Sequence, residues 1–306
     1  MPASDKPKSP LTCLQNRRFR MIVFDWDGTA VPNRQAPIGR LKDKTERLLG
    51  EGILFVVITG TNLDNIHCQF TEKIRKELRG GIIIYCNRGS EVYGFNDTGE
   101  TFPIFRHEAT EFENHVMDEV AAEMQSILAE KSITSQIVSN RMNRRKIDLL
   151  PGWEVEKSEI GDALISVQNM LEKAGISGGI EWAADKLSSL ARDKGLDDLR
   201  ITSDVKHLEF GLTDKSDSVE YIMEKLLPER GLSLDDVIFI GDEFGEVGGF
   251  IGSDSLMMKP ASTQGGLFIS VGKEPNGVPD GVIHYRHGPE GFMEILDILQ
   301  SNSNLD

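Results

Sequence analysis

The sequence predicts an α/β protein whose core is a doubly wound, Rossmann-like parallel sheet. The first observation is a set of short apolar runs bounded by turn residues, which are typical of buried parallel strands. These runs are RMIVF (20–24), ILFVVI (53–58), GIIIYC (81–86), VIFI (237–240) and LFISV (267–271). The second observation is that helical segments alternate with the first three runs, as in a doubly wound sheet. Because ligands bind beyond the carboxyl ends of such strands, we expect the functional site to follow Phe24, Ile58 and Ile240.

The elements between these strands follow from spacing and from turn residues. Leu41, Leu48 and Leu49 recur at helical intervals, and the glycines at 50 and 52 predict the end of that helix. The segment 62–78 is also predicted to be helical. After Cys86 the sequence predicts short strands on either side of a turn at 96–99.

A second group of elements interrupts the sheet and predicts an inserted α+β domain. We expect this domain to span 107–205, between core segments 19–106 and 206–306. Its predicted helices lie near 111–131 and 160–174, and its predicted strands lie near 136–138, 146–149 and 180–182. The first 18 residues lack an apolar run, and we expect them to form a disordered polar tail rather than a secretory signal.

Composition excludes several classes of protein. The chain has 306 residues, of which 39% are apolar and 27% charged, which is typical of a globular domain. Its net charge of −15 disfavours nucleic acid as a partner, and no apolar run is long enough to span a membrane. Cys13, Cys68 and Cys86 show no disulfide or zinc spacing, so we expect a reducing, cytoplasmic location. The oligomeric state is left open.

The strongest chemical signal is Asp25-Trp26-Asp27-Gly28-Thr29, directly after the first predicted strand. In an extended segment, residues two apart project to one side, so Asp25 and Asp27 can share a site. Two neighbouring carboxylates repel each other, and a divalent cation relieves that repulsion. Gly28 would allow a sharp turn, and Thr29 would add a hydroxyl group.

Three further segments follow in order along the chain. Thr59-Gly60-Thr61-Asn62 follows the second strand, where Thr61 or Asn62 could instead cap the next helix. Lys215 opens a predicted helix and can offset the charge of a carboxylate and a phosphate. Gly241-Asp242-Glu243 follows the fourth strand. For a second acidic residue after Asp242, we favour Asp254 over Glu246.

This set of motifs resembles the haloacid dehalogenase superfamily, whose first motif is D-x-D-G-T. The resemblance implies that Asp25 is a nucleophile that forms an aspartyl-phosphate, and that Asp27 is the general acid and base. It implies that Thr59 and Lys215 hold the phosphoryl group, with Gly60, Thr61 and Asn62 nearby. It also implies a Mg²⁺ site formed by Asp25, the backbone carbonyl of Asp27, Asp242 and Asp254. Ser216 departs from the family, in which glycine often follows the lysine.

The position of the insertion resembles that of the C2-capped, type IIB group, which includes Cof-like phosphatases, sucrose- and trehalose-phosphate phosphatases and phosphomannomutases. In the expected cap, the segment 139–146 is basic, and Arg141 and Arg144 could bind an anionic substrate or simply form a solvated strand edge. Asn87 and Arg88, which follow the third strand, are further substrate-binding candidates.

The resemblance implies a Mg²⁺-dependent phosphatase that acts on a small phosphate ester, such as a sugar or polyol phosphate. The alternative is a phosphosugar mutase that uses the same aspartyl-phosphate and requires a second phosphate site in the cap. A sensor that binds without catalysis is disfavoured, because binding alone requires neither a nucleophile nor an acid.

Overall fold

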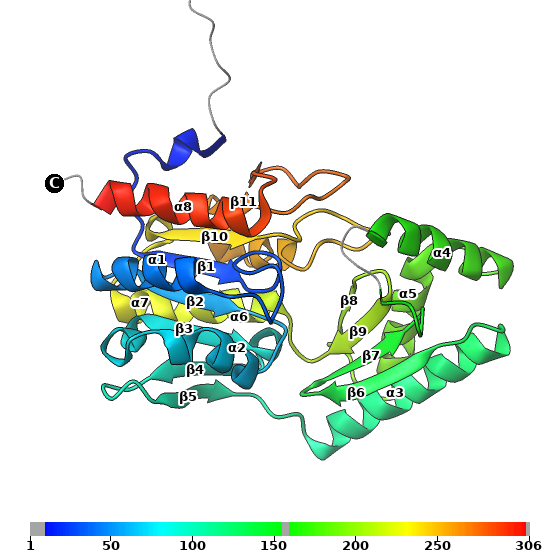
Figure 1. The fold of residues 1–306 in the computed structure, drawn as a ribbon. Coiled ribbons are helices and arrows are strands. Elements are labelled where there is room, and N and C mark those ends of the chain that lie inside the picture. Colours follow the sequence, from blue (N-terminus) through cyan, green and yellow to red (C-terminus); the bar gives the residue numbers. More distant parts are fainter. Residues whose placement is uncertain (1–9, 155–158, 304–306) are drawn as a thin grey trace, which may run out of the picture. The chain divides into compact units, whose positions relative to one another are not determined.

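The structure is a computed structural model that describes residues 10–154 and 159–303. The chain forms two compact units. Unit 1 comprises Met1–Arg106, Lys215–Gly245 and Ser253–Asp306, and unit 2 comprises His107–Asp214 and Glu246–Gly252. Each unit has its own sheet and its own apolar core (Figure 1).

Unit 1 contains an eight-stranded sheet in the order β12-β11-β10-β1-β2-β3-β4-β5. The first six strands in this order are parallel, and β4 and β5 are antiparallel. The strands are β1 (Met21–Asp25), β2 (Leu54–Ile58), β3 (Ile82–Cys86), β4 (Glu91–Phe95), β5 (Thr101–Arg106), β10 (Val237–Gly241), β11 (Leu267–Ser270) and β12 (Val282–His284).

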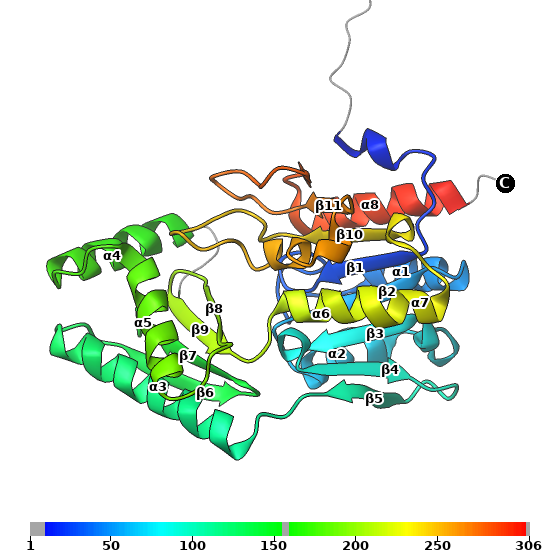
Figure 2. The same ribbon diagram turned by 180° about the vertical axis from the view of Figure 1, so that it is seen from behind.

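Helices cover both faces of this sheet because the central strands are apolar on both sides. One face packs against α1 (Gly39–Gly50), α2 (Leu63–Gln69) and α8 (Gly288–Ser303). The other face packs against α6 (Lys215–Tyr221), a π-helical turn (Ile222–Leu226) and α7 (Leu227–Arg230), which are seen in front in Figure 2. The predicted α/β class with a largely parallel core sheet is confirmed.

Unit 2 contains a four-stranded antiparallel sheet in the order β6-β7-β9-β8. Its strands are β6 (Gln136–Arg141), β7 (Arg144–Asp148), β8 (Arg200–Ser203) and β9 (His207–Gly211). The helices α3 (Glu111–Glu130), α4 (Ile160–Lys173) and α5 (Gly179–Asp193) form one apolar cluster with β7 and β9.

Two expectations for the inserted region differ from the structure. The segment 180–182, expected to be a strand, begins helix α5, because Ile180, Ala183 and Leu187 recur at helical spacing and are all buried. The core was expected to resume at residue 206. The structure instead places 207–214 in unit 2, because β9 pairs with β7 and β8.

The predicted helix over 62–78 is broken after Gln69. Phe70 and Ile74 leave helical geometry and are both buried in the core, at 0% and 1% exposure. The Arg79 guanidinium donates to the carbonyls of Glu72 and Ile74, which a continuous helix would have paired, and also to the carbonyl of Gly99.

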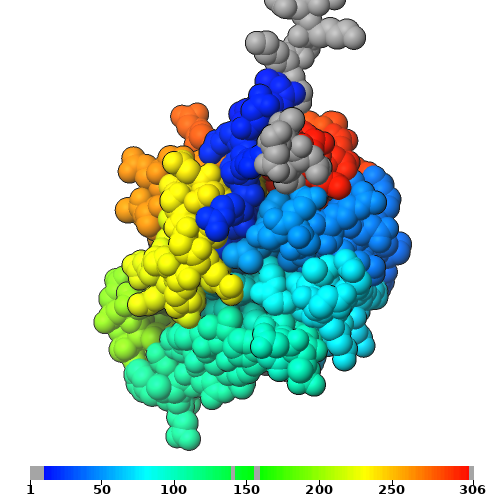
Figure 3. Space-filling view, turned by 90° about the vertical axis from the view of Figure 1, so that its left-hand side faces the viewer, coloured from blue at the N-terminus to red at the C-terminus, as the bar shows by residue number. Residues whose placement is uncertain are grey.

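The polar N-terminal segment is ordered over part of its length. Pro10–Leu14 forms a short 3₁₀ helix in which Leu11 and Leu14 are buried. The Asn302 side chain of α8 donates to the carbonyls of Leu14 and Arg17. Figure 3 shows this dark blue segment along the surface of unit 1. Residues 1–9 of the expected tail lie outside the described residues.

Among the helices of the described residues, none is long and apolar enough to cross a membrane.

Candidate functional site

The register of the parallel sheet brings three distant segments to one edge. Asp25 is the last residue of β1 and pairs with Ile58 of β2, so Thr59 follows directly on the neighbouring strand. On the other side of β1, Phe24 pairs with Ile240 of β10, so Asp242 follows at the same edge. The carboxyl ends of these strands therefore meet, although β10 lies more than 200 positions after β1 in the sequence.

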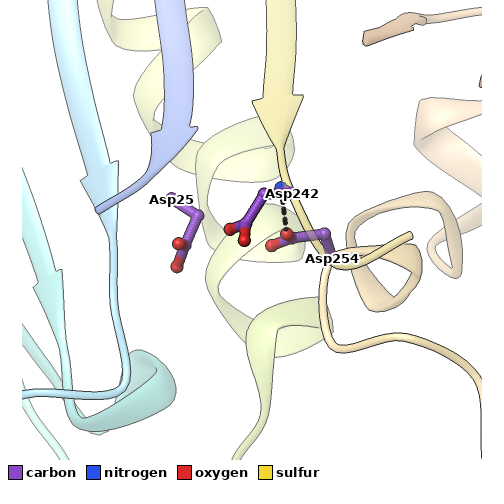
Figure 4. A group of neighbouring side chains, drawn as sticks. All are labelled: Asp25, Asp242 and Asp254. Carbon is purple, nitrogen blue, oxygen red and sulfur yellow. Dashed lines mark hydrogen bonds between the residues drawn. The ribbon is translucent and has the colours of Figure 1, made fainter. Parts of the chain in front are cut away.

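A cluster of three buried carboxylates lies at this edge. Asp25, Asp242 and Asp254 each offer a carboxylate oxygen, and these oxygens lie within 4.8 Å of one another. Figure 4 shows Asp25 at the end of β1 and Asp242 after β10, with Asp254 reaching in from the following loop. Lys215, the first residue of α6 and only 3% exposed, places its Nζ 2.7 Å from Asp25 Oδ1 and 2.6 Å from Asp254 Oδ1.

Asp254 holds this arrangement together. Its Oδ2 accepts hydrogen bonds from the backbone N–H groups of Asp242 (2.9 Å) and Glu243 (2.8 Å). A Cβ at Gly241 would overlap the Asp254 carboxylate, so a larger residue there would push that side chain away. Of the two candidates for the second acidic position, the structure brings Asp254 into the cluster. Glu246 belongs to unit 2.

The cluster has an excess of negative charge, with three carboxylates facing the single Lys215 ammonium. Burial raises the pKa of Asp25 to about 7. The nearby Lys215 opposes that rise, and the Asp254 charge adds to it. Burial alone would lower the pKa of Lys215, but Asp25 and Asp254 outweigh it and raise that pKa above its ordinary value. The lysine therefore stays charged, and a proton or a cation bound among the three carboxylates would lower their mutual repulsion.

The residues after Asp25 form a tight turn. Gly28 has a φ of 96°, a conformation that favours glycine, and its N–H donates to Val31 O at 2.7 Å. Thr29 is fully buried and donates its hydroxyl to Asp242 Oδ1 at 2.9 Å, which orients that carboxylate.

The Asp27 carboxylate has a charged partner, Arg34, which was not among the residues expected from the sequence. Its Oδ2 lies 2.9 Å from Arg34 Nε, and the two side chains are 30% and 44% exposed. Arg34 therefore adds a partly exposed cation beside the acidic motif. No motif marks this arginine in the sequence, and only its short distance along the chain from Asp27 could have suggested it.

Backbone hydrogen bonds join the loop after β2 to the loop after β3. Asn87 N–H donates to Thr61 O (2.9 Å), and Arg88 N–H donates to Thr59 O (3.0 Å). Asn87 and Arg88 both have positive φ, 50° and 56°, which is uncommon for residues other than glycine. The Asn87 side chain also donates to the buried Glu91 at 2.7 Å. The structure thus places Asn87 and Arg88 beside the Thr59 loop, as support for its backbone.

The polar side chains of the Thr59 loop also have structural roles. The Thr59 hydroxyl accepts from Thr61 N–H at 3.2 Å, and Thr59 is only 1% exposed. Asn62 caps α2 by accepting from Asn65 N–H, while the Asn65 side chain donates to the Thr61 hydroxyl at 2.6 Å. The capping role considered for Asn62 is therefore present, and Gly60 lies between Thr59 and Thr61 in the same turn.

The basic candidates lie in unit 2, where Arg144, Arg145 and Lys146 all have acidic partners. Arg144 Nη1 lies 3.4 Å from Glu209 Oε2, and Lys146 Nζ lies 2.9 Å from Glu209 Oε1. Arg144 is 6% exposed, so it does not form a solvated strand edge. Arg141 is the last residue of β6 and pairs with Arg144 in the β6–β7 register, but its side chain is outside the described part of the structure.

The acidic cluster fits a hard divalent cation. Its donors are carboxylate oxygens, which Mg²⁺ prefers, and they converge within a few ångströms. A bound cation would also lower the repulsion between the three carboxylates.

Comparison with solved structures identifies the fold. The Plasmodium falciparum IMP-nucleotidase superposes with a TM-score of 0.60 at 10% identity, over 97% of this chain and 66% of that chain. The C-terminal domain of Candida albicans trehalose-6-phosphate phosphatase gives a TM-score of 0.58 at 14% identity, over 94% and 93% of the two chains. The Aspergillus fumigatus trehalose-6-phosphate phosphatase gives 0.55 at 14% identity, over 93% of each chain.

These similarities show that the chain shares the fold of these phosphatases, which is the fold expected from the resemblance to the haloacid dehalogenase superfamily. This chain spans just under two thirds of the IMP-nucleotidase chain. No family model and no curated protein matches this chain by sequence.

Proposed function

We propose that this chain is a Mg²⁺-dependent phosphomonoester hydrolase of the haloacid dehalogenase type. The observation that carries the proposal is the buried cluster of Asp25, Asp242 and Asp254 around Lys215 at the carboxyl edge of the sheet. A buried excess of carboxylates is costly unless a ligand compensates it, and such sites are candidates for catalysis.

In the proposed reaction Asp25 is the nucleophile. One carboxylate oxygen forms a bond to phosphorus, the ester P–O bond breaks, and the leaving oxygen takes a proton from Asp27. Asp27 then removes a proton from water, whose oxygen attacks phosphorus. The acyl phosphate bond breaks, which releases inorganic phosphate and restores the Asp25 carboxylate.

Two further side chains would bind the phosphoryl group. Lys215 would move its contact from the Asp25 oxygen to a phosphoryl oxygen, and the Thr59 hydroxyl would donate to another. Asp25, Asp242, Asp254 and the backbone carbonyl of Asp27 would hold Mg²⁺. The ion would supply positive charge that lowers the repulsion between the carboxylate and the phosphoryl oxygens.

For the substrate we propose a small phosphate ester, and in particular a sugar or polyol phosphate. The fold shared with trehalose-6-phosphate phosphatase supports a sugar phosphate, while the fold shared with IMP-nucleotidase makes nucleotides the necessary comparison. Unit 2 would act as the cap that selects the substrate and excludes water. Gly60, Thr61, Asn62, Asn87, Arg88, Arg141 and Arg144 remain the proposed substrate-binding residues.

Hydrolysis is favoured over phosphosugar transfer by the ion pairs of unit 2. A mutase requires a second phosphate site, for which the basic segment 141–146 is the candidate. Arg144 and Lys146 are engaged by Glu209, so a phosphate would have to displace that carboxylate.

The test is phosphate release from a panel of sugar, polyol and nucleotide monophosphates, with Mg²⁺ and with a chelator. We expect Mg²⁺-dependent release from a sugar or polyol phosphate, and its loss in Asp25→Asn, which keeps the size of the side chain but removes the nucleophile. Asp43→Asn, at an exposed position on α1, is the matched control and should retain full activity. Isomerisation that depends on a sugar bisphosphate, without net phosphate release, would establish the mutase instead.

A further inference from the structure

The loop that carries Asp242 is packed against the segment that follows β11. Gly241 pairs with Ser270, and Val271 N–H donates to Gly241 O at 2.8 Å. At Gly272 the two backbones approach so closely that a Cβ would overlap Asp242 O. The backbone of Asp242 is therefore in direct contact with the segment that follows β11.

Glu274 lies in the space between these two segments, within unit 1. Its carboxylate is 7% exposed, and its Oε1 accepts hydrogen bonds from Phe244 N–H (3.1 Å) and from the Ser270 hydroxyl. Its Oε2 lies 2.9 Å from His284 Nε2 on β12. A Cβ at Gly245 would lie 2.7 Å from the Glu274 side chain, so the absence of a side chain there leaves room for this glutamate.

We propose that Glu274 is a positioning residue for the Asp242 carboxylate, acting through the backbone of Phe244. The segment 241–245 begins and ends with glycine, which permits many backbone conformations, and it has to present Asp242 in one of them. A buried side-chain oxygen that accepts a backbone N–H is a strong constraint, because water does not compete for the hydrogen bond. This inference rests on the proposed function, since it assigns Glu274 to the same metal site.

Glu274 does not touch the acidic cluster, so its effect on a bound metal would be indirect. Groups that orient metal ligands typically contribute about 10- to 100-fold to metal affinity. A glutamate that serves only to stabilise the fold would instead change the melting temperature and leave metal affinity unchanged.

Two conservative variants test the length of the Glu274 side chain and its charge separately. Glu274→Gln keeps the length and an oxygen acceptor for Phe244 N–H, whereas Glu274→Asp keeps the charge but shortens the side chain by one methylene group. We expect Glu274→Asp to raise the Kd for Mg²⁺ about tenfold, and Glu274→Gln to stay within about threefold of the wild type. Lys273→Ala, at the exposed neighbouring position, is the control and should bind as the wild type does.

The measurements are Mg²⁺ titration by calorimetry without substrate, and kinetics of the same proteins at increasing Mg²⁺. In Glu274→Asp, kcat should return towards the wild-type value at saturating Mg²⁺, with the substrate KM unchanged. A wild-type Kd in a folded Glu274→Asp variant would overturn this inference alone, as would a Glu274→Gln variant as impaired as Glu274→Asp. Failure of the wild type to bind Mg²⁺ would overturn the proposed metal site and this inference with it.

Discussion

Lys215 in unit 1 is buried and the Glu209 side chain in unit 2 is 12% exposed, and each is held between two opposite charges. Lys215 lies between Asp25 and Asp254, and Glu209 lies between Arg144 and Lys146. Their wider surroundings differ in the balance of charge. In unit 1 a third carboxylate, Asp242, joins the group and leaves it negative.

In unit 2 the basic residues of β7 find further acidic partners. Arg145 pairs with Asp118, and Lys146 also lies 3.8 Å from Asp204. This group therefore contains as many cations as carboxylates: Arg144, Arg145 and Lys146 face Glu209, Asp118 and Asp204. The comparison shows that burial alone does not mark a functional site, whereas the convergence of several carboxylate oxygens within a few ångströms is a feature that fits a bound cation.

The largest effect is expected from Lys215→Met, which removes the single ammonium from the acidic cluster. Activity should fall about 10³-fold, because a preorganised positive charge on the phosphoryl group is lost. In chelator the variant should also unfold at lower temperature than the wild type, because three carboxylates are left without a counter-charge. Steady-state kinetics and thermal unfolding measure the two effects.

Lys206 provides the matched control for that substitution. It is a buried lysine of unit 2, 8% exposed, and its Nζ lies 3.4 Å from Asp148 Oδ2. Lys206→Met should destabilise the protein and leave kcat of the folded fraction unchanged. If the two lysine variants lost activity equally, the distinction between the two clusters would not hold.

A smaller effect, on stability alone, is expected from Glu209→Gln. The substitution removes the carboxylate shared by the buried Arg144 and by Lys146, whose side chain is 16% exposed, and should lower the free energy of unfolding by about 3 kcal/mol. Denaturant unfolding measures this loss, and Mg²⁺ titration should show no change in Kd. Asp118→Asn, whose carboxylate is 58% exposed, should cost at most about 1 kcal/mol. A weakened Mg²⁺ affinity in Glu209→Gln would contradict a purely structural role.

The smallest effect is a pH dependence of the stabilisation by Mg²⁺. Because the pKa of Asp25 is raised to about 7, the metal-free folded state holds a proton there that the unfolded state has already lost above about pH 4. That contribution to stability is present at low pH and is lost as the pH rises through about 7, where a cation can replace the proton.

We therefore expect Mg²⁺ to raise the Tm more at about pH 8 than at about pH 6. Thermal unfolding in Mg²⁺ and in chelator at the two pH values measures the difference. Asp25→Asn, which has no titratable group at this position, should reduce the dependence on pH. An equal Mg²⁺ shift at both pH values in the wild type would show that Asp25 does not compete with the metal for a proton.

Local patterns in the sequence predicted most of the core sheet. The five apolar runs correspond to β1, β2, β3, β10 and β11, with ends shifted by at most one residue. The class was predictable because buried parallel strands are apolar on both faces and alternate with helices. Where the sequence-based prediction failed, contacts between residues far apart in the sequence determined the local structure. Ile180 lies in the first turn of helix α5, which packs in the core of unit 2. Leu14 is buried, and its carbonyl accepts a hydrogen bond from the Asn302 side chain.

The order of the acidic and threonine motifs could likewise be read from the sequence, because each follows a strand whose carboxyl end lies at a common edge. The sequence favoured Asp254 over Glu246 without fixing the choice, and it did not reveal the support of Asp242 by Thr29 and Glu274. Those contacts join residues 30 to more than 200 positions apart, through side-chain lengths and backbone approaches that exist only after the sheet has formed.

By itself, then, the sequence determined the class of fold and the set of chemical groups, because hydrophobic periodicity and motif composition are properties of neighbouring residues. The tertiary structure alone decided which charges are compensated. It matched the basic residues of β7 with carboxylates, and it brought three carboxylates together beside Lys215. The physical reason is that electrostatic balance depends on distance and burial in space, and separation along the chain fixes neither.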